Sequence, residues 1–286
     1  MGNPMASRLA RAGVDLAVWN RTASKAEALR ACGAHPHAAL SEAVRGADIV
    51  ISMLEAGPVV AEVLGAALPL LQPGCLWIDM SSTSQAEALA FHAQLLEAGC
   101  SFIDAPVSGG VAGAQAGTLA IMAGGSLEDF ARGEALLQLL GVPSLVGPAG
   151  SGQIAKLCNQ LIVGGTLNII AEALLLAQAA GADPAAVRGA MRGGFAESRL
   201  LELHGQRMLE RNFLPGGQVK SQLKDLHNVL AAAAEAGLVL PLAALVTDTY
   251  RSIAHDFPHA DQSAALLAVE RLNPGKGIGE GPDQLP

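Results

Sequence analysis

Residues 48–79 read DIVISMLEAGPVVAEVLGAALPLLQPGCLWID, and this stretch decides the fold class of the chain. Two short, continuously apolar runs at 48–54 and 75–79 have the length and composition of buried strands. The amphipathic segment between them, 59–68, has the spacing of a helix. Short apolar strands separated by helices are typical of a parallel sheet that is covered on both faces. The stretch therefore predicts an α/β domain with a doubly wound sheet.

The same alternation extends in both directions from this stretch as far as a glycine-rich run at 147–152. Before it we expect a strand at 14–19 and a helix at 24–32. After it we expect strands at 101–104, 118–122 and 144–146 and helices at 85–98 and 127–140. Beyond the glycine-rich run the pattern predicts only helices, at 153–180, 184–192, 199–210, 223–236, 242–254 and 263–272. The expected organisation is an α/β domain at 1–149, an all-helical domain at 150–272 and a loose tail at 273–286.

Composition excludes several classes of protein. Of the 286 residues 51% are hydrophobic and only 15% are charged, so the chain buries a large core and is not disordered. The net charge of −8, with no run of Lys or Arg, gives no surface for a nucleic-acid backbone. The aromatic content of 3% also leaves few rings on which bases stack.

The apolar stretches and the cysteines indicate the cellular compartment that we expect for the protein. The longest apolar stretch, 161–181, contains Asn168, Glu172 and Gln178, which are costly in a bilayer, so we expect a buried core helix and no membrane. No targeting segment is visible at the start of the sequence. The four cysteines are widely spaced, which favours reduced thiols over disulfides or a zinc site. We expect a cytoplasmic protein.

Two segments have features of a dinucleotide site. Gly2 opens a helix with Pro4 in its first turn, a geometry suited to an anion at a helix N-terminus. Asn20, Arg21 and Thr22 follow a predicted strand. A neutral Asn followed by Arg and Thr accepts a ribose 2′-phosphate, where an acidic residue would bind the free hydroxyl. The sequence therefore favours NADP(H), with NAD(H) as the alternative coenzyme, unless these residues form only a solvated turn that caps the next helix.

The loop 104–114, DAPVSGGVAGA, has the composition of a substrate clamp. Its adjacent glycines, Gly109 and Gly110, let backbone N–H groups approach a ligand closely, and Ser108 adds a hydroxyl. We expect this segment to bind a carboxylate. The alternative is an ordinary flexible loop.

Lys156, Asn159 and Gln160 lie on one face of the predicted helix at 153–180, because they occupy positions i, i+3 and i+4. This face begins one turn after the glycine-rich run. An isolated lysine on an apolar helix is usually a surface residue, but the two amides beside it favour a polar site.

The histidine-rich segment 255–261, HDFPHAD, is the remaining candidate for chemistry. Its spacing is irregular and it contains Pro258, so we interpret it as a loop and expect no metal.

Three motifs in this order resemble the β-hydroxyacid dehydrogenase family, which includes 3-hydroxyisobutyrate dehydrogenase and tartronate semialdehyde reductase. They are DAPVSGG at 104–110, GxGxxxKxxN at 150–159 and Lys224-Asp225-Leu226. The resemblance covers nearly the whole chain. It implies a 6-phosphogluconate dehydrogenase-like architecture, and the segments around Gln160, 192–194 and 211–216 are most similar to those of the tartronate semialdehyde reductases.

The resemblance also implies a role for each matching residue. Lys156 corresponds to the catalytic lysine, and the substrate would contact Ser108, Gly109, Gly110 and Asn159. The coenzyme would contact Gly2, Asn20, Arg21, Thr22, Met53, Leu54, Thr83 and Lys224.

The activity implied by the resemblance is reduction of a small semialdehyde that carries a carboxylate, with tartronate semialdehyde to glycerate favoured. A hydride moves to the aldehyde carbon, and Lys156 stabilises and protonates the oxygen. The alternatives are a 3-hydroxyisobutyrate dehydrogenase, a succinic semialdehyde reductase, an imine reductase, or a non-catalytic paralogue. Imine reductases usually replace the lysine that is present here. A homodimer or homotetramer is also implied.

Gly2 matches the third glycine of a GxGxxG fingerprint when the chain is aligned by these motifs. We therefore expect that the first strand and two glycines lie upstream, and that Met1 is an internal methionine. The short form would be an inactive, truncated protein, because loss of a central strand removes on the order of 10 kcal/mol of burial.

Overall fold

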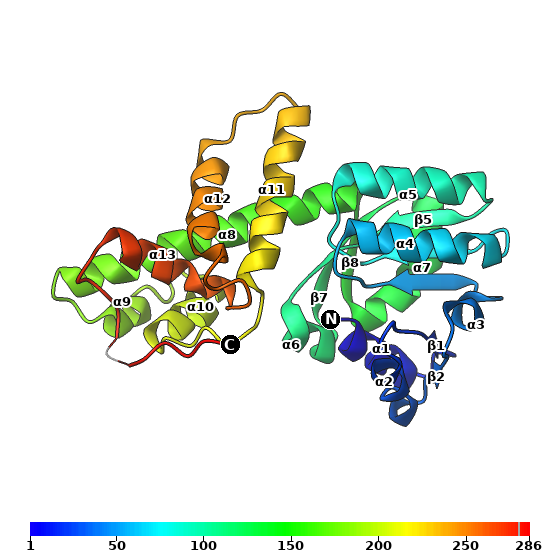
Figure 1. Ribbon diagram of the computed structural model, residues 1–286, viewed down its shortest axis with the longest axis horizontal. Helices are drawn as coiled ribbons and strands as arrows, with labels where there is room; N and C mark the ends of the chain where they lie inside the picture. The colour runs from blue at the N-terminus through cyan, green and yellow to red at the C-terminus, as the bar shows by residue number, and fades with distance from the viewer. Residues whose placement is uncertain (280) are drawn as a thin grey trace. The chain divides into compact units, whose positions relative to one another are not determined.

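The computed structural model describes residues 1–279 and 281–286, which form two compact units, Met1–Lys156 and Leu157–Pro286. Helix α8 (Ser151–Ala179) is continuous across this boundary (Figure 1). The boundary therefore lies inside α8, slightly after the position that the glycine-rich run suggests.

The first unit is built on a six-stranded sheet. Its strands are β3 (Ile49–Ser52), β4 (Leu76–Asp79), β5 (Ser101–Asp104), β6 (Val107–Ser108), β7 (Leu119–Gly124) and β8 (Gly141–Gly147). β3, β4 and β5 pair in parallel, which confirms the parallel sheet that the sequence predicts. Beyond β5 the sheet is mixed, because β7 runs antiparallel to β5 and β6 and parallel to β8.

Helices cover both faces of this sheet, since adjacent strand residues point to opposite sides. The helices of this unit are α1 (Gly2–Arg11), α2 (Ala23–Glu27), α3 (Leu40–Val44), α4 (Gly57–Ala67), α5 (Gln85–Glu97), α6 (Gly110–Ala116) and α7 (Leu127–Leu140) (Figure 1). Leu76 and Ile78 pack with α1 and α7, whereas Trp77 and Phe102 pack with α4 and α5. The α/β class is thus confirmed.

Several short elements differ from the sequence-based expectation. The segment expected as a loop at 104–114 contains β6 and most of α6. β1 (Ala17–Val18) and β2 (His35–Pro36) pair in parallel as a separate two-stranded sheet. β2 and α3 were not predicted at all, because two to five residues are too few to show a hydrophobic period.

The second unit is all-helical, as predicted. After α8 it contains α9 (Pro184–Ala190), α10 (Arg199–Leu209), α11 (Val219–Glu235), α12 (Pro241–Ala254) and α13 (Ala265–Leu272). α11 and α12 run side by side (Figure 1). Buried residues of α8 such as Leu167, Ala171 and Leu174 share one core with Phe213 and Tyr250. α8 is the one helix in the described part of the chain that is long and apolar enough to span a membrane. Of its most apolar window 44% is buried, and the buried side packs into this core.

The C-terminal segment is not the loose tail that its Gly and Pro content predicted. Ile278 is fully buried, and Arg211 contacts the carboxylates of Glu270 and Asp283. The Phe213 N–H also donates to the Gln284 carbonyl at 2.9 Å. These contacts anchor the tail, and a composition-based expectation cannot anticipate them.

Candidate active site

Three polar residues lie in one row at the carboxyl ends of β3, β4 and β5: Ser52, Asp79 and Asp104 are register partners across the strands. The Asp79 Oδ1 accepts hydrogen bonds from the hydroxyls of Ser52 and Ser81, each at 2.7 Å. Its Oδ2 is buried and has no hydrogen-bond partner among the described residues. Burial raises the pKa of Asp79 to about 6, although the serine hydroxyls oppose the shift.

Asp104 accepts hydrogen bonds at the start of α8, from the residue before the helix and from its first turn. Its Oδ1 accepts from the Gly150 N–H at 2.7 Å, and its Oδ2 accepts from the Gln153 N–H at 2.8 Å. These donors would otherwise lack partners at the helix start. Burial raises the pKa of Asp104 to about 7, with the two N–H donors opposing the shift. Gly152 allows this close approach, because a Cβ there would lie 2.5 Å from the Asp104 carbonyl oxygen.

The Gln153 side chain links α8 to the segment 81–83. Its Oε1 accepts from the Thr83 N–H at 3.0 Å, and its Nε2 donates to the Ser81 carbonyl at 2.9 Å. Gln153 is fully buried, and Thr83 is 2% exposed. The Ser81 hydroxyl in turn accepts from the Leu54 N–H at 2.9 Å. The residues that follow β3 and β4 are therefore joined to the start of α8 by one buried network.

Lys156 lies one helical turn after Gln153 on α8 and is 7% exposed, which excludes the interpretation as a surface lysine. Asn159 follows after one further turn, on the same face of the helix.

In the second unit a chain of hydrogen bonds joins Asn159 to Lys224. The Asn159 Nδ2 donates to the Gln160 Oε1 at 2.8 Å, and the Gln160 Nε2 donates to the Asp225 Oδ2, also at 2.8 Å. The Lys224 ammonium lies 3.1 Å from the other oxygen of Asp225. Both ends of the Gln222 amide, on α11, contact Gln160. The Gln222 Oε1 accepts from the Gln160 Nε2 at 3.1 Å, and the Gln222 Nε2 donates to the Gln160 backbone carbonyl at 2.9 Å. Two predicted site residues, Asn159 and Lys224, therefore belong to one network.

The turn between β6 and α6 holds Ser108, Gly109 and Gly110. Both glycines have positive φ, 137° and 64°, which side chains rarely tolerate. Gly110 is exposed and has open space where a Cβ would lie. The backbone therefore adopts a conformation that favours glycine, and Gly110, two residues after the partly exposed Ser108, leaves open space.

Five of the residues predicted for the coenzyme, Asn20, Arg21, Thr22, Met53 and Leu54, follow the ends of β1 and β3. A Cβ on Gly2 would lie 3.7 Å from the Cβ of Met53, so the start of α1 lies against the segment that follows β3. Asn20, Arg21 and Thr22 are exposed after β1, and the Asn20 Oδ1 accepts from the Thr22 N–H at 2.9 Å. An exposed guanidinium in such a turn fits the chemistry of a phosphate.

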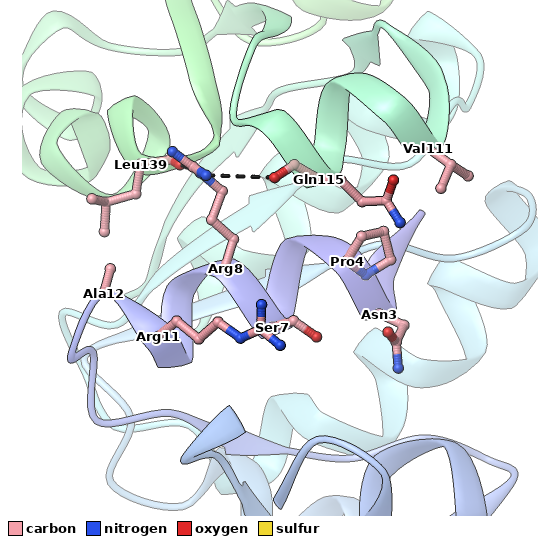
Figure 2. Close-up of a pocket in the computed structure, with 9 residues that line it drawn as sticks. All are labelled: Asn3, Pro4, Ser7, Arg8, Arg11, Ala12, Val111, Gln115 and Leu139. Atoms are coloured by element: carbon pink, nitrogen blue, oxygen red, sulfur yellow. Dashed lines mark hydrogen bonds between the residues drawn. The ribbon is translucent and has the colours of Figure 1, made fainter. Parts of the chain in front are cut away.

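A separate cavity of about 600 Å³ lies along α1 and α6 (Figure 2). Arg8 donates from its side chain to the carbonyls of Leu139 and Gln115 at the rim of this cavity. Its other lining residues include Ser7, Arg11 and Val111, and none of the predicted site residues lines it. It is therefore distinct from the candidate site.

The histidine-rich loop does not gather metal ligands. Within residues 1–279 and 281–286 no group of three His, Cys, Asp or Glu side chains is arranged to hold an ion. The His255 Nδ1 lies 3.0 Å from the Asp256 carboxylate.

Sequence reasoning missed the supporting residues of the site. Asp79, Ser81, Gln153, Gln222 and Asp225 received no role. The signal available for Asp79 was its position at the end of a predicted apolar strand, where a buried charge is costly. Gln153, by contrast, is a common residue in helices, so that only the fold identifies its three partners.

Comparison with known proteins places this chain in a family. The first part of the chain, residues 1–173, matches the NAD binding domain of 6-phosphogluconate dehydrogenase. Residues 150–269 match the NAD-binding domain of NADP-dependent 3-hydroxyisobutyrate dehydrogenase.

Individual relatives agree with these domain matches. The chain is 41% identical to a 2-hydroxy-3-oxopropionate reductase of Escherichia coli (strain K12), over 95% of this chain and 94% of the relative. It is 37% identical to a probable mitochondrial 3-hydroxyisobutyrate dehydrogenase-like protein of Arabidopsis thaliana, over 96% and 83% of the two chains. The solved structure of a Mycobacterium tuberculosis 3-hydroxyisobutyrate dehydrogenase with L-serine superposes with a TM-score of 0.86 at 31% identity, over 94% and 95% of the two chains. The chain thus belongs to the β-hydroxyacid dehydrogenase family of NAD(P)-dependent oxidoreductases.

Proposed function

We propose that this enzyme reduces tartronate semialdehyde (2-hydroxy-3-oxopropionate) to glycerate with NADPH, and that Lys156 is its acid/base residue. The observation that carries the proposal is the buried position of Lys156 on α8, one turn from Asn159. Similarity to a 2-hydroxy-3-oxopropionate reductase supports the substrate. The exposed Arg21 and the match to an NADP-dependent domain support the coenzyme.

The chemistry follows from charge. The bound nicotinamide coenzyme supplies a hydride to the aldehyde carbon. As the C–H bond forms, the carbonyl electron pair moves to the oxygen, where the Lys156 ammonium stabilises the growing negative charge and transfers a proton. The product is a primary alcohol, and solvent restores the proton on the lysine. Asn159 orients the substrate, and the turn at Ser108, Gly109 and Gly110 binds its carboxylate.

The remaining assignments concern the coenzyme. Gly2 begins α1, and Met53 and Leu54 follow the carboxyl end of β3. In open sheets a dinucleotide pyrophosphate binds in this region. Thr83 is assigned to the nicotinamide side of the coenzyme, and Lys224 to a position beside the coenzyme.

A panel of semialdehydes tests the substrate. With NADPH consumption as the readout, kcat/KM should be highest for tartronate semialdehyde, followed by methylmalonate and succinate semialdehydes. A tenfold preference for another member of the panel would overturn the substrate assignment but leave the reaction class intact.

Substitution of the lysine tests the mechanism. We expect Lys156→Ala to lower kcat by roughly 10²–10⁴, because it removes the proton donor, while the Kd for NADPH stays near the wild-type value. Lys276→Ala, at an exposed lysine, is the matched control. Turnover within threefold of wild type in Lys156→Ala would show that another group carries the proton.

We also propose a cytoplasmic homodimer or homotetramer that associates through α8. Ile162, Ile169 and Leu176 recur every seven residues on one side of the helix and are 65–70% exposed, which is costly for a free surface. Ile169→Glu should therefore reduce the mass measured by light scattering. Leu272→Glu, at an exposed leucine on α13, should leave the mass unchanged. An unchanged mass in Ile169→Glu would exclude this face.

A further inference from the structure

The first turn of α8 is fixed by side chains from outside the helix. Asp104, at the end of β5, accepts with one carboxylate oxygen from the N–H of Gly150, just before the helix, and with the other from the N–H of Gln153, in its first turn. Gln153 binds the segment 81–83 with both ends of its amide. Asp104 and Gln153 are both 0% exposed, so water cannot replace either set of bonds.

This attachment controls both the position and the rotation of the helix. The two carboxylate bonds fix how far the start of α8 lies from β5, because one oxygen binds the N–H of the residue before the helix and the other binds an N–H of its first turn. The Gln153 amide fixes the rotation of α8 about its axis, because its two bonds go to the backbone of Ser81 and Thr83 in the segment after β4. Lys156 lies three residues after Gln153, about one turn along a rigid helix.

A helix cap that only stabilised α8 would not need the additional bonds from the Gln153 amide to the segment 81–83. Elsewhere in the same unit, α7 begins with Ser126, whose hydroxyl accepts from the Asp129 N–H at 3.0 Å. That cap is exposed and local, and it suffices for a helix of fourteen residues. The start of α8 instead carries a buried carboxylate, which is costly to desolvate, and a buried amide with two long-range partners.

We propose that Asp104 and Gln153 are positioning residues for Lys156, holding the first turn of α8 so that the ammonium reaches the substrate oxygen. The proposal rests on the proposed role of Lys156 as the acid/base residue. A displacement of about 1 Å in a reacting group costs up to 10²-fold in rate, so the loss of either attachment should reduce kcat.

The first experiment compares two substitutions with a control. Asp104→Asn keeps the shape of the side chain but places an amide NH₂ against one of the two N–H donors. Gln153→Met keeps the volume and removes both side-chain hydrogen bonds. At pH 8, above the pKa of Asp104, each should lower kcat 10–100-fold and change the Kd for NADPH by less than threefold. Ser126→Ala should lower the melting temperature and leave kcat unchanged. If both site variants keep kcat within threefold of wild type, the proposal fails.

The second experiment asks whether the effect passes through Lys156. In a Lys156→Ala background, Asp104→Asn and Gln153→Met should lower the residual rate by less than threefold, because the group that they position is gone. The same 10–100-fold loss in that background would mean a general structural role and would overturn the proposal. Failure of the proposed function is visible separately, as near-normal turnover of the Lys156→Ala single variant. If Asp104→Asn does not fold, the Gln153→Met pair alone decides.

Discussion

Asn20, Arg21 and Thr22 form an exposed turn after β1, in which the Thr22 N–H donates to the Asn20 side chain at 2.9 Å. This bond fixes the backbone of the turn but leaves the Arg21 guanidinium on the surface. A guanidinium forms charge-assisted hydrogen bonds with phosphate that are roughly twice as strong as neutral ones. We therefore propose that the preference for NADPH over NADH depends chiefly on the Arg21 side chain.

Arg21→Ala should raise the Kd for NADPH by roughly 10–100-fold, because charge-assisted hydrogen bonds contribute about 1.5–3 kcal/mol. The Kd for NADH should change by less than threefold, since NADH lacks the 2′-phosphate. Coenzyme fluorescence measures both constants, and Arg45→Ala, at another exposed arginine, is the control. An equal loss for both coenzymes would mean that Arg21 does not contact the 2′-phosphate.

At the scale of an element, the proposed binding of the substrate carboxylate depends on the turn between β6 and α6. Gly109 and Gly110 both have positive φ there, and a Cβ on Gly109 would lie 3.1 Å from a methyl group of Leu119. The position of Ser108 relative to α6 thus depends on a backbone conformation that only glycine adopts easily.

Gly109→Ala should destabilise the protein by about 1–3 kcal/mol, because φ is 137° and the added methyl contacts Leu119. The KM for the semialdehyde should rise, whereas the Kd for NADPH should stay within threefold of wild type. Gly65→Ala is the matched control. Gly65 lies inside α4 with open space around its Cβ position, so this substitution should raise the melting temperature. A Gly109→Ala enzyme with unchanged KM would remove this turn from the substrate site.

Helix α8 connects two networks, one within each unit. In the first unit Asp104 and Gln153 hold its start, and in the second unit Gln160 and Asp225 hold the turn that carries Asn159. Lys156 thus follows Gln153 by one turn, and Asn159 is adjacent to Gln160. The side chains of Gln153 and Gln160 both bond to other parts of the fold.

At the scale of the whole molecule, the buried carboxyl groups link stability to pH. The pKa of Asp79 is raised to about 6 by burial, whereas in the unfolded chain the group titrates near its ordinary value of about 4. Between these values the native protein binds more protons than the unfolded chain. Stability therefore decreases as pH rises from about 4 to about 6, and Asp104, with a pKa near 7, acts in the same direction.

Asp79→Asn should remove the contribution of one titrating proton to the decrease in unfolding free energy with pH. That contribution is about 1.4 kcal/mol per pH unit between pH 4 and 6. The reason is that asparagine resembles the protonated acid and does not titrate. Urea unfolding across pH 4–8 measures the effect. Asp15→Asn, whose native side chain is 95% exposed, should leave the slope unchanged. If the Asp79→Asn and wild-type curves stay parallel, Asp79 does not titrate with a raised pKa in the native protein.

The two-unit organisation and the family were predictable from the sequence, because both depend on local patterns. Apolar runs of four to seven residues have the period of buried strands, and the long helices repeat apolar residues at helical spacing. The motifs around Ser108, Lys156 and Lys224 lie within short segments of chain. Lys156, Asn159 and Gln160 share a helix face whatever the rest of the molecule does, so the sequence alone predicted them as a group.

Only the tertiary structure decided which residues support the site. Asp104 and Gln153 are 49 residues apart, and Thr83 and Gln153 are 70 apart, so no local pattern connects them. The antiparallel direction of β7, the anchoring of the tail by Arg211 and the orphan oxygen of Asp79 likewise depend on contacts between distant segments. The sequence by itself predicted the longer helices and strands and the candidate reacting side chains. The tertiary structure decided how those side chains are held, because hydrogen bonds and burial depend on distance in space and not on distance along the chain.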